Sequence, residues 1–295
     1  MLKWISTIVL AAAFISMISG CANYPDDYPM EEQSFPPQGE ANEVAAPVSL
    51  YPPRVIDQVV DTEEEYIPRV PVVALTFDDG PSRHTSRILD VLEQYDGRAT
   101  FFVLGYRVEP HRDVIMRAAN MGNEIVNHTW SHSDLTSISQ EEVVAQIQST
   151  SAAIEAITGY SPRFYRPPFG RTNSSVRYVS TGLGYAIVNW TLDTLDWRYR
   201  DADRIYDTIM SEVEDGAVIL LHDIHITTAE AMERVIPSLI AKGFKLVTVS
   251  EVLDYLYGDL EPGRIYGKIY DDELLEELLL EELLLEELYY TNWDS

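Results

Sequence analysis

The sequence is short of cysteine and of basic residues, and each shortage excludes a class of protein. A single cysteine in 295 residues, Cys21, excludes a framework of internal disulfides and a zinc site built from several cysteines. Lysine and arginine together number 21 against 48 acidic residues, which gives a formal net charge of −27. Because nucleic-acid binding needs clustered cations, this balance argues against a nucleic-acid partner. With 46% hydrophobic residues, the chain can still bury a sizeable core.

A long hydrophobic run is also missing, even at the N-terminus. Residues 5–18 are mostly apolar and follow Lys3, but they are fewer than the roughly 20 residues that a membrane-spanning helix needs. We therefore predict a signal peptide over residues 1–20. Its end, Ser19-Gly20-Cys21, resembles the lipobox of bacterial lipoproteins, which implies cleavage before Cys21 and lipidation of its sulfur. The alternative is an ordinary secretory signal. The protein is expected outside the cytoplasm, anchored to the membrane by lipid or, without lipidation, secreted.

Two acidic flanks carry most of the negative charge. Residues 22–70 hold eleven acids, two bases and eight prolines without sustained apolar periodicity, so we predict a disordered tether over 21–70. Residues 271–295 hold ten acids and no base. Within them, 273–288 contain only nine leucines and seven glutamates, in a five-residue repeat that turns about 500° on a helix and gives no apolar stripe. We expect 259–295 to be an acidic tail without a catalytic role; partner binding is the alternative.

Between the flanks, β-branched or aromatic runs alternate with helical periods. The predicted strands are Val72–Phe77, Ala99–Val103, Glu124–Asn127, Arg163–Tyr165, Tyr185–Trp190, Ala217–Leu221 and Lys245–Val249. The predicted helices cover 84–95, 111–121, 139–158, 173–182, 203–213, 228–242 and 250–257. The helix at 139–158 is marked by a capping box between Ser139 and Glu142. This alternation predicts one α/β domain over 71–258, either a parallel (β/α) barrel or a doubly wound sheet.

Acids and histidines follow five of the predicted strands. In either fold the carboxyl ends of parallel strands meet at one edge, and functional residues collect there. The five segments are TFDDG at 76–80, HTWSH at 128–132, RPPFG at 166–170, DTLDW at 193–197 and LLHD at 220–223. Each segment alone is more often a turn, a loop or a helix-surface pair. Five in succession at strand ends indicate a catalytic edge.

The residue types in these segments suit metal-assisted hydrolysis. Asp78 and Asp79 are adjacent at a strand end, so their side chains point apart and can take different tasks. His128 and His132 are four residues apart, a spacing that suits two imidazoles on one cation. Two histidines and one carboxylate form a common open site for zinc or another divalent metal. Such a metal lowers the pKa of bound water and polarises a carbonyl oxygen.

Two further side chains could supply the proton transfers. Arg166 could pair with the free aspartate and keep it ionised as a base. His222 could protonate a leaving group, held cationic by a carboxylate such as Asp196. These are the parts of a hydrolase of amides or esters. The remaining histidines, His84, His111 and His225, receive no role; as an alternative, His225 could line the same edge, because it follows the sixth predicted strand.

The five segments, in this order, resemble the motifs of the polysaccharide deacetylases of carbohydrate esterase family 4, which share the NodB homology domain. The resemblance covers about residues 70–257 and implies a distorted (β/α) barrel of about seven parallel strands. It also implies removal of N-acetyl groups from N-acetylglucosamine polymers, or of O-acetyl groups from xylan.

The resemblance further implies a role for each matching residue. Asp78 would be the general base, oriented by Arg166, and Asp79, His128 and His132 would bind the metal. The backbone N–H of Phe169 would stabilise the oxyanion, and His222, tuned by Asp196, would be the general acid. Trp197 and Leu220 would form the walls of the acetyl pocket. Zinc is the expected metal, with cobalt, nickel or manganese as alternatives. Two positions depart from the family pattern, Ser133 where many members have proline and Phe169 where tyrosine is frequent. Neither departure removes a group assigned to metal binding or proton transfer.

The expected location of the protein outside the cytoplasm indicates which polymer is its substrate. A lipid-anchored enzyme outside the cell meets its own wall first, so we expect the substrate to be N-acetylglucosamine in peptidoglycan. The alternatives are a chitooligosaccharide or acetylxylan deacetylase, a peptide amidase on the same metal site, and a non-catalytic glycan-binding lipoprotein.

Overall fold

The structure, a computed structural model, describes residues 70–268. The expected signal peptide, Cys21, nearly all of the expected tether and the Glu/Leu repeat lie outside the described residues. Across the described part, none of the helices combines the length and the apolar character needed to cross a bilayer.

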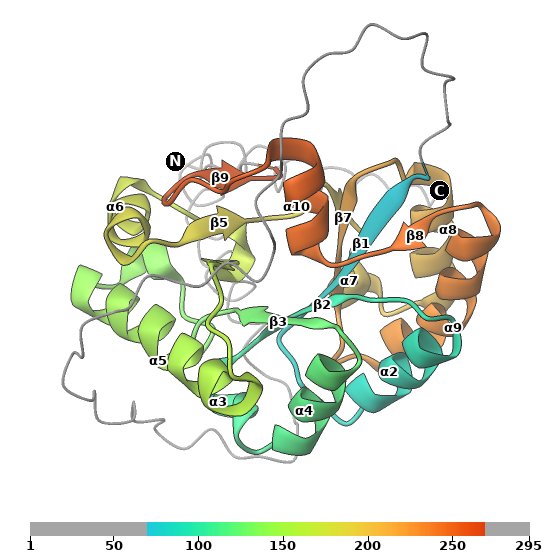
Figure 1. The fold of residues 1–295 in the computed structure, drawn as a ribbon, viewed down its shortest axis with the longest axis horizontal. Helices are drawn as coiled ribbons and strands as arrows, with labels where there is room; N and C mark the ends of the chain where they lie inside the picture. The colour runs from blue at the N-terminus through green and yellow to red at the C-terminus, as the bar shows by residue number, and fades with distance from the viewer. Residues whose placement is uncertain (1–69, 269–295) are drawn as a thin grey trace, which may run out of the picture. The chain divides into compact units, whose positions relative to one another are not determined.

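Strands and helices alternate along the described chain, as the sequence pattern predicts (Figure 1). The strands are β1 (Val72–Asp78), β2 (Thr100–Val103), β3 (Glu124–Asn127), β4 (Phe164–Tyr165), β5 (Ala186–Val188), β6 (Leu192–Asp193), β7 (Ala217–His222), β8 (Lys245–Leu246) and β9 (Ile265–Tyr266). The α-helices are α2 (Thr85–Gln94), α3 (Gly105–Val108), α4 (Arg112–Asn120), α5 (Gln140–Thr158), α6 (Ser174–Leu183), α7 (Asp196–Tyr199), α8 (Ala202–Glu212), α9 (Ile226–Ala241) and α10 (Val249–Tyr257). Short 3₁₀ helices occur at Leu135–Ser137 and Pro168–Gly170.

All described strands belong to one parallel sheet, which curls into the distorted (β/α) barrel that the resemblance implies. The hydrogen-bonded order is β6-β7-β1-β2-β3-β4-β5-β9, and β8 pairs with β1. Helices α2, α4, α5 and α9 follow the outer side of the curved sheet, whereas α10 lies on its other side (Figure 1). Because the strands are parallel, their carboxyl ends share one edge, and the last residue of β1, Asp78, is in register with His222 at the end of β7.

Side-chain alternation along β1 divides the core between the two faces of the sheet. Val73, Leu75 and Phe77 pack with the helices of the outer side, and Ala74 packs with residues of α10 on the inner side. Since successive side chains of a strand point to opposite faces, Thr76 and Asp78 share the inner face with Ala74. Asp78 is 2% exposed. The strand therefore delivers a buried carboxylate to the catalytic edge.

The sheet differs from the expected one at its ends. The expected strand Tyr185–Trp190 is limited to Ala186–Val188, and β6 follows as a separate two-residue strand. Val249 is not in a strand: Thr248 accepts a hydrogen bond from the backbone N–H of Glu251 and forms a capping box that starts α10. Strand β9 lies in the segment expected as tail and pairs with β5, so the described sheet extends to residue 266.

Candidate active site

The five predicted segments lie together at the carboxyl edge of the sheet, and their backbone is unusually strained. Five of the seven non-glycine residues with positive φ in the described chain belong to these segments: Asp79, Thr129, His132, Phe169 and Leu195. Positive φ is costly for a residue with a Cβ and persists only where surrounding contacts impose it. At Asp79, with φ of 71°, the chain turns away from β1 so that its side chain points elsewhere than that of Asp78.

Asp79, His128 and His132 form a compact group of potential metal ligands. Oδ1 of Asp79 lies 3.4 Å from Nε2 of His128 and 3.2 Å from Nε2 of His132. Nδ1 of His128 lies 2.8 Å from the backbone carbonyl oxygen of Arg166. A carbonyl oxygen only accepts, so Nδ1 carries a proton, and in the neutral ring Nε2 is the nitrogen whose lone pair faces Asp79. The backbone after β4 thus selects the tautomer of His128 that can bind a metal.

The electrostatics of this group also suit a cation. Oδ1 of Asp79 is buried and has no hydrogen-bond partner among the described residues. Burial opposes ionisation of this carboxyl, but the charges of the surrounding histidines, His132 first, lower its pKa below the usual range. Burial lowers the pKa of His132, which favours its neutral, metal-binding form. An ionised carboxylate oxygen and two neutral imidazole nitrogens are a donor set that Zn²⁺ accepts.

Arg166 holds Asp78 from beneath the site. Its guanidinium is fully buried, and Nη1 donates to Oδ1 of Asp78 at 2.7 Å and to the hydroxyl of Thr76 at 2.8 Å. Nε donates to the carbonyl oxygen of Val188, and Nη2 donates to that of Asn189, both at 3.1 Å. The other Asp78 oxygen, Oδ2, lies 3.7 Å from Nε2 of His128. One carboxylate oxygen is therefore fixed by arginine, and the second faces the ligand group.

His222, which is partly exposed, and the fully buried Asp196 form a dyad beside Asp78. Nδ1 of His222 donates to Oδ1 of Asp196 at 2.8 Å, and the backbone N–H of His222 donates to Oδ2 at 2.7 Å. Burial lowers the pKa of His222, but the charge of Asp196 and its hydrogen bond, followed by Asp79 and Asp78, outweigh burial and raise it to about 10. The same contacts lower the pKa of Asp196 against the effect of burial. The imidazole is held cationic, with Nδ1 occupied and Nε2 left for a substrate.

The residues expected around a substrate differ in exposure. Phe169 is 38% exposed, with φ of 60°, and its ring meets that of His132 edge-on at a centroid distance of 4.8 Å. Trp197 is 37% exposed on α7, and Leu220 is buried near the end of β7. Thr194 donates a hydrogen bond to the carbonyl oxygen of Leu220 and ties the segment after β6 to β7. Two partly exposed rings and a buried aliphatic side chain thus belong to the segments at this edge.

Four polar residues that support the site were given no role by the sequence. Thr76 receives the second Arg166 hydrogen bond, and Asn189 donates from its side chain to the carbonyl oxygen of Gly170. Thr228 donates to Asp196 at 2.7 Å. Asp223 accepts from the hydroxyl of Thr85 and lies against Gly80. Thr76 and Asp223 belong to recognised segments, but nothing in the sequence distinguishes Asn189 or Thr228 from other polar residues.

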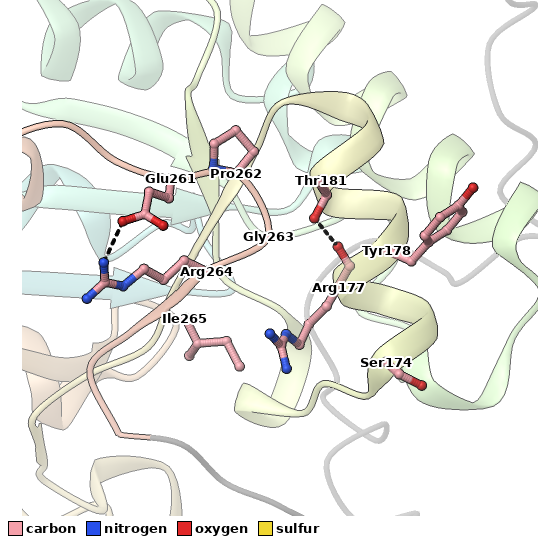
Figure 2. Close-up of a pocket in the computed structure, with 9 residues that line it drawn as sticks. All are labelled: Ser174, Arg177, Tyr178, Thr181, Glu261, Pro262, Gly263, Arg264 and Ile265. Carbon is pink, nitrogen blue, oxygen red and sulfur yellow. Dashed lines mark hydrogen bonds and ion pairs between the residues drawn. The ribbon is translucent and has the colours of Figure 1, made fainter.

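A surface groove of about 870 Å³ lies between α6 and residues 261–265 (Figure 2). Its lining residues are Ser174, Arg177, Tyr178, Thr181, Glu261, Pro262, Gly263, Arg264 and Ile265. None of the residues expected to be catalytic, metal-binding or substrate-binding lines this groove. The expected chemistry therefore lies at the edge of the sheet and not in the groove.

Known proteins match the chain across this domain. A family described as polysaccharide deacetylase matches residues 66–188. The peptidoglycan-N-acetylmuramic acid deacetylase PdaC of Bacillus subtilis is 43% identical over 191 residues, which are 64% of this chain and 40% of that protein. A chitooligosaccharide deacetylase of Rhizobium leguminosarum is 35% identical over 189 residues, 59% of this chain and 88% of that protein. A solved structure of Bacillus subtilis PdaC superposes with a TM-score of 0.61 at 42% identity, over 64% of this chain and 92% of that one.

The matches differ in how much of each relative they cover. The chain spans about 40% of the length of the first two curated relatives, PdaC and a peptidoglycan-N-acetylglucosamine deacetylase of Listeria monocytogenes.

Proposed function

Because this chain belongs to the polysaccharide deacetylase family, we propose that it removes acetyl groups from an extracellular polysaccharide by metal-dependent hydrolysis. The expected substrate is the N-acetylglucosamine of peptidoglycan. The observation that carries this proposal is the joint placement of a metal-ligand group, an arginine-held carboxylate and a cationic histidine dyad at one edge of the sheet.

The metal ligands in this proposal are Asp79, His128 and His132. The unpartnered, buried Oδ1 of Asp79 and the fixed tautomer of His128 fit a divalent cation, with zinc first and cobalt, nickel or manganese as alternatives. Bound there, the cation would polarise the acetyl carbonyl and lower the pKa of a water molecule.

Asp78 is the proposed general base. Its Oδ2 accepts the proton of the attacking water, while Oδ1 stays bonded to Arg166. The charge-assisted hydrogen bond from the guanidinium restricts rotation of the carboxylate, so the free oxygen keeps facing the ligand group. Arg166 therefore acts by orienting the base.

His222 is the proposed general acid. Its Nε2 donates a proton to the departing amine nitrogen, and Asp196 keeps Nδ1 protonated and the ring oriented. The backbone N–H of Phe169 is proposed to donate to the developing oxyanion. Trp197 and Leu220 are proposed to wall the pocket for the acetyl methyl group. The products are acetate and a glucosamine unit.

A second candidate substrate is the N-acetylmuramic acid of the same polymer. It is favoured by the name of the Bacillus subtilis relative, whereas the Listeria relative is named for N-acetylglucosamine. Both names share peptidoglycan, and both place the action outside the cytoplasm. We propose the same location for this chain, held at the membrane through a lipid on Cys21 and a tether over 21–70. The catalytic domain of this proposal covers the expected 71–258 together with strand β9, which completes its sheet, and the rest of the acidic segment 259–295 has no catalytic role.

The test is acetate release by the purified chain after chelation and addition of Zn²⁺ or Co²⁺. Peptidoglycan, chitopentaose and acetylxylan are offered side by side, with Asp78→Asn as the control. Mass spectrometry of the digested peptidoglycan then assigns each lost acetyl group to N-acetylglucosamine or N-acetylmuramic acid. Metal-dependent release from peptidoglycan that Asp78→Asn abolishes is the expected result. No release from any polymer, with stoichiometric metal bound, would contradict an enzymatic role.

A further inference from the structure

We propose that Thr228 is a positioning residue of this site: its hydroxyl fixes the Asp196 carboxylate and, through it, the imidazole of His222. The catalytic consequence rests on the function proposed above, in which His222 is the general acid. The structural consequence, a fixed dyad, does not depend on turnover.

Thr228 reaches the dyad from a third element of the fold. His222 ends β7, Asp196 begins α7, and Thr228 lies in the first turn of α9. Its Oγ1 donates to Oδ2 of Asp196 at 2.7 Å, and the residue has no exposed surface. The helix thereby contributes one buried donor to a carboxylate 32 residues earlier in the chain.

Four donors around the Asp196 carboxylate restrict its rotation. Oδ1 accepts from Nδ1 of His222 at 2.8 Å and from the backbone N–H of Trp197 at 2.9 Å. Oδ2 accepts from the backbone N–H of His222 and from Thr228, each at 2.7 Å. Without the hydroxyl, Oδ2 keeps one donor. With three donors left instead of four, the carboxylate is held less firmly against turning about its Cβ–Cγ bond, and such a turn moves Oδ1 relative to the imidazole.

The remaining polar neighbours of His222 do not replace this contact. Asp78 and Asp79 act on its imidazole through their charges from the β1 side. The ring of His225, at the start of α9, lies 6.0 Å from that of His222 between centroids, and Arg200 acts on His225 by charge. Asp78 and Asp79 influence the charge of His222, whereas Thr228 bonds directly to Oδ2 of Asp196 and so helps to set the geometry of that carboxylate.

The neighbouring residue offers a matched control. Thr227 has the same side chain in the same turn of α9, and its buried Oγ1 has no hydrogen-bond partner among the described residues. Thr227→Val and Thr228→Val replace a hydroxyl by a methyl group of similar size. Only the second removes a hydrogen bond.

The experiment uses the full chain and two readouts. In the metal-free protein, ¹H NMR follows the low-field resonance of the His222 Nδ1–H, identified by its loss in His222→Gln. With metal restored, acetate release gives kcat and KM. We expect Thr228→Val to shift the resonance and to lower kcat about tenfold, the equivalent of one hydrogen bond of about 1.4 kcal/mol, with KM unchanged within about twofold. Thr228→Ser should restore both, and Thr227→Val should match the unaltered protein.

Three results would overturn the proposal. They are a Thr228→Val protein indistinguishable from Thr227→Val, a Thr228→Ser protein as impaired as Thr228→Val, and an unchanged resonance despite a slower reaction. Circular dichroism verifies folding, and Thr228→Ala replaces Thr228→Val if that variant does not fold. If the unaltered protein releases no acetate, the proposed function fails, and the NMR comparison still decides whether the hydroxyl fixes the dyad.

Discussion

Replacing Arg166 by methionine tests how much the buried contacts of this arginine stabilise the protein, independently of any activity. The guanidinium has no exposed surface and makes four hydrogen bonds, to Asp78, Thr76 and the carbonyl oxygens of Val188 and Asn189. It also stacks on Phe102, with Cζ 3.9 Å from the ring centroid. Methionine fills similar space without donors. The variant therefore isolates the polar contacts of the arginine.

The expected loss of stability follows from what those partners would lose. Asp78 is buried, and removing one member of a buried ion pair costs about 3–5 kcal/mol because the other charge is left uncompensated. Two carbonyl oxygens also lose a donor, at about 1 kcal/mol each, and protonation of Asp78 offsets part of the total. We expect Arg166→Met to lower the free energy of unfolding by about 4 kcal/mol, a large share of the roughly 5–15 kcal/mol of a typical domain.

Equilibrium urea denaturation of the metal-free protein, followed by tryptophan fluorescence, measures this loss. Arg171 provides the control, because it pairs with Asp134 at 2.9 Å with both side chains about one-quarter exposed. Such a pair contributes less than about 1 kcal/mol, so Arg171→Met should unfold near the midpoint of the unaltered protein. A loss below about 1 kcal/mol for Arg166→Met, with an unchanged m-value, would refute the view that Arg166 supports the site.

Three other changes have expected outcomes. Asp79→Asn should lose tight Zn²⁺ binding in calorimetry while Asp78→Asn keeps it; equal binding by both would contradict the ligand assignment. In the metal-free protein, protonated His222 contributes to the free energy of unfolding. This contribution is complete below about pH 6.5, the pKa of histidine in the unfolded chain, and is lost as the pH rises through the folded pKa of about 10. His222→Gln should therefore flatten the decline of the unfolding free energy between about pH 7 and 10 in urea titrations, and an equally steep decline would oppose this. Gly80→Ala sets a Cβ against a buried carboxylate and should cost about 1–3 kcal/mol in thermal unfolding. Gly182→Ala, in open space near the end of α6, should be neutral or stabilising by up to about 1 kcal/mol, and the opposite order would refute the steric reading.

The sequence predicted helices and strands correctly where residues within one short segment determine the element. The capping box at Ser139 and Glu142 starts α5 as expected, because both partners lie within one helical turn. The buried runs of β1 and β7 are strands as expected. The prediction failed at Val249, where the cap at Thr248 starts a helix inside a run of β-branched residues. It also missed β9, because a two-residue strand has no periodicity to detect.

The supporting contacts around the site were less predictable. Arg166 and Asp78 are 88 residues apart. The residue types at the strand ends suggested that Arg166 pairs with one of the two aspartates, and the resemblance to a family identified that aspartate as Asp78. Thr228 had no signal, since a threonine near a helix start is ordinary in any sequence. Its neighbour Thr227 has the same side chain, and the hydroxyl of Thr227 has no hydrogen-bond partner among the described residues. Only the rotation of α9 against α7 and β7 distinguishes the two.

The sequence by itself determined the α/β class, the order of the longer helices and strands, and the set of residues at the strand ends, because local periodicity and chain connectivity fix which residues follow each strand. Tertiary structure decided which of their atoms meet. The pairing of β1 with β7 sets Asp78 in register with His222, the backbone after β4 selects the tautomer of His128, and helix packing delivers the Thr228 hydroxyl to Asp196. Such contacts depend on the relative positions of elements far apart in the chain, which no local pattern encodes.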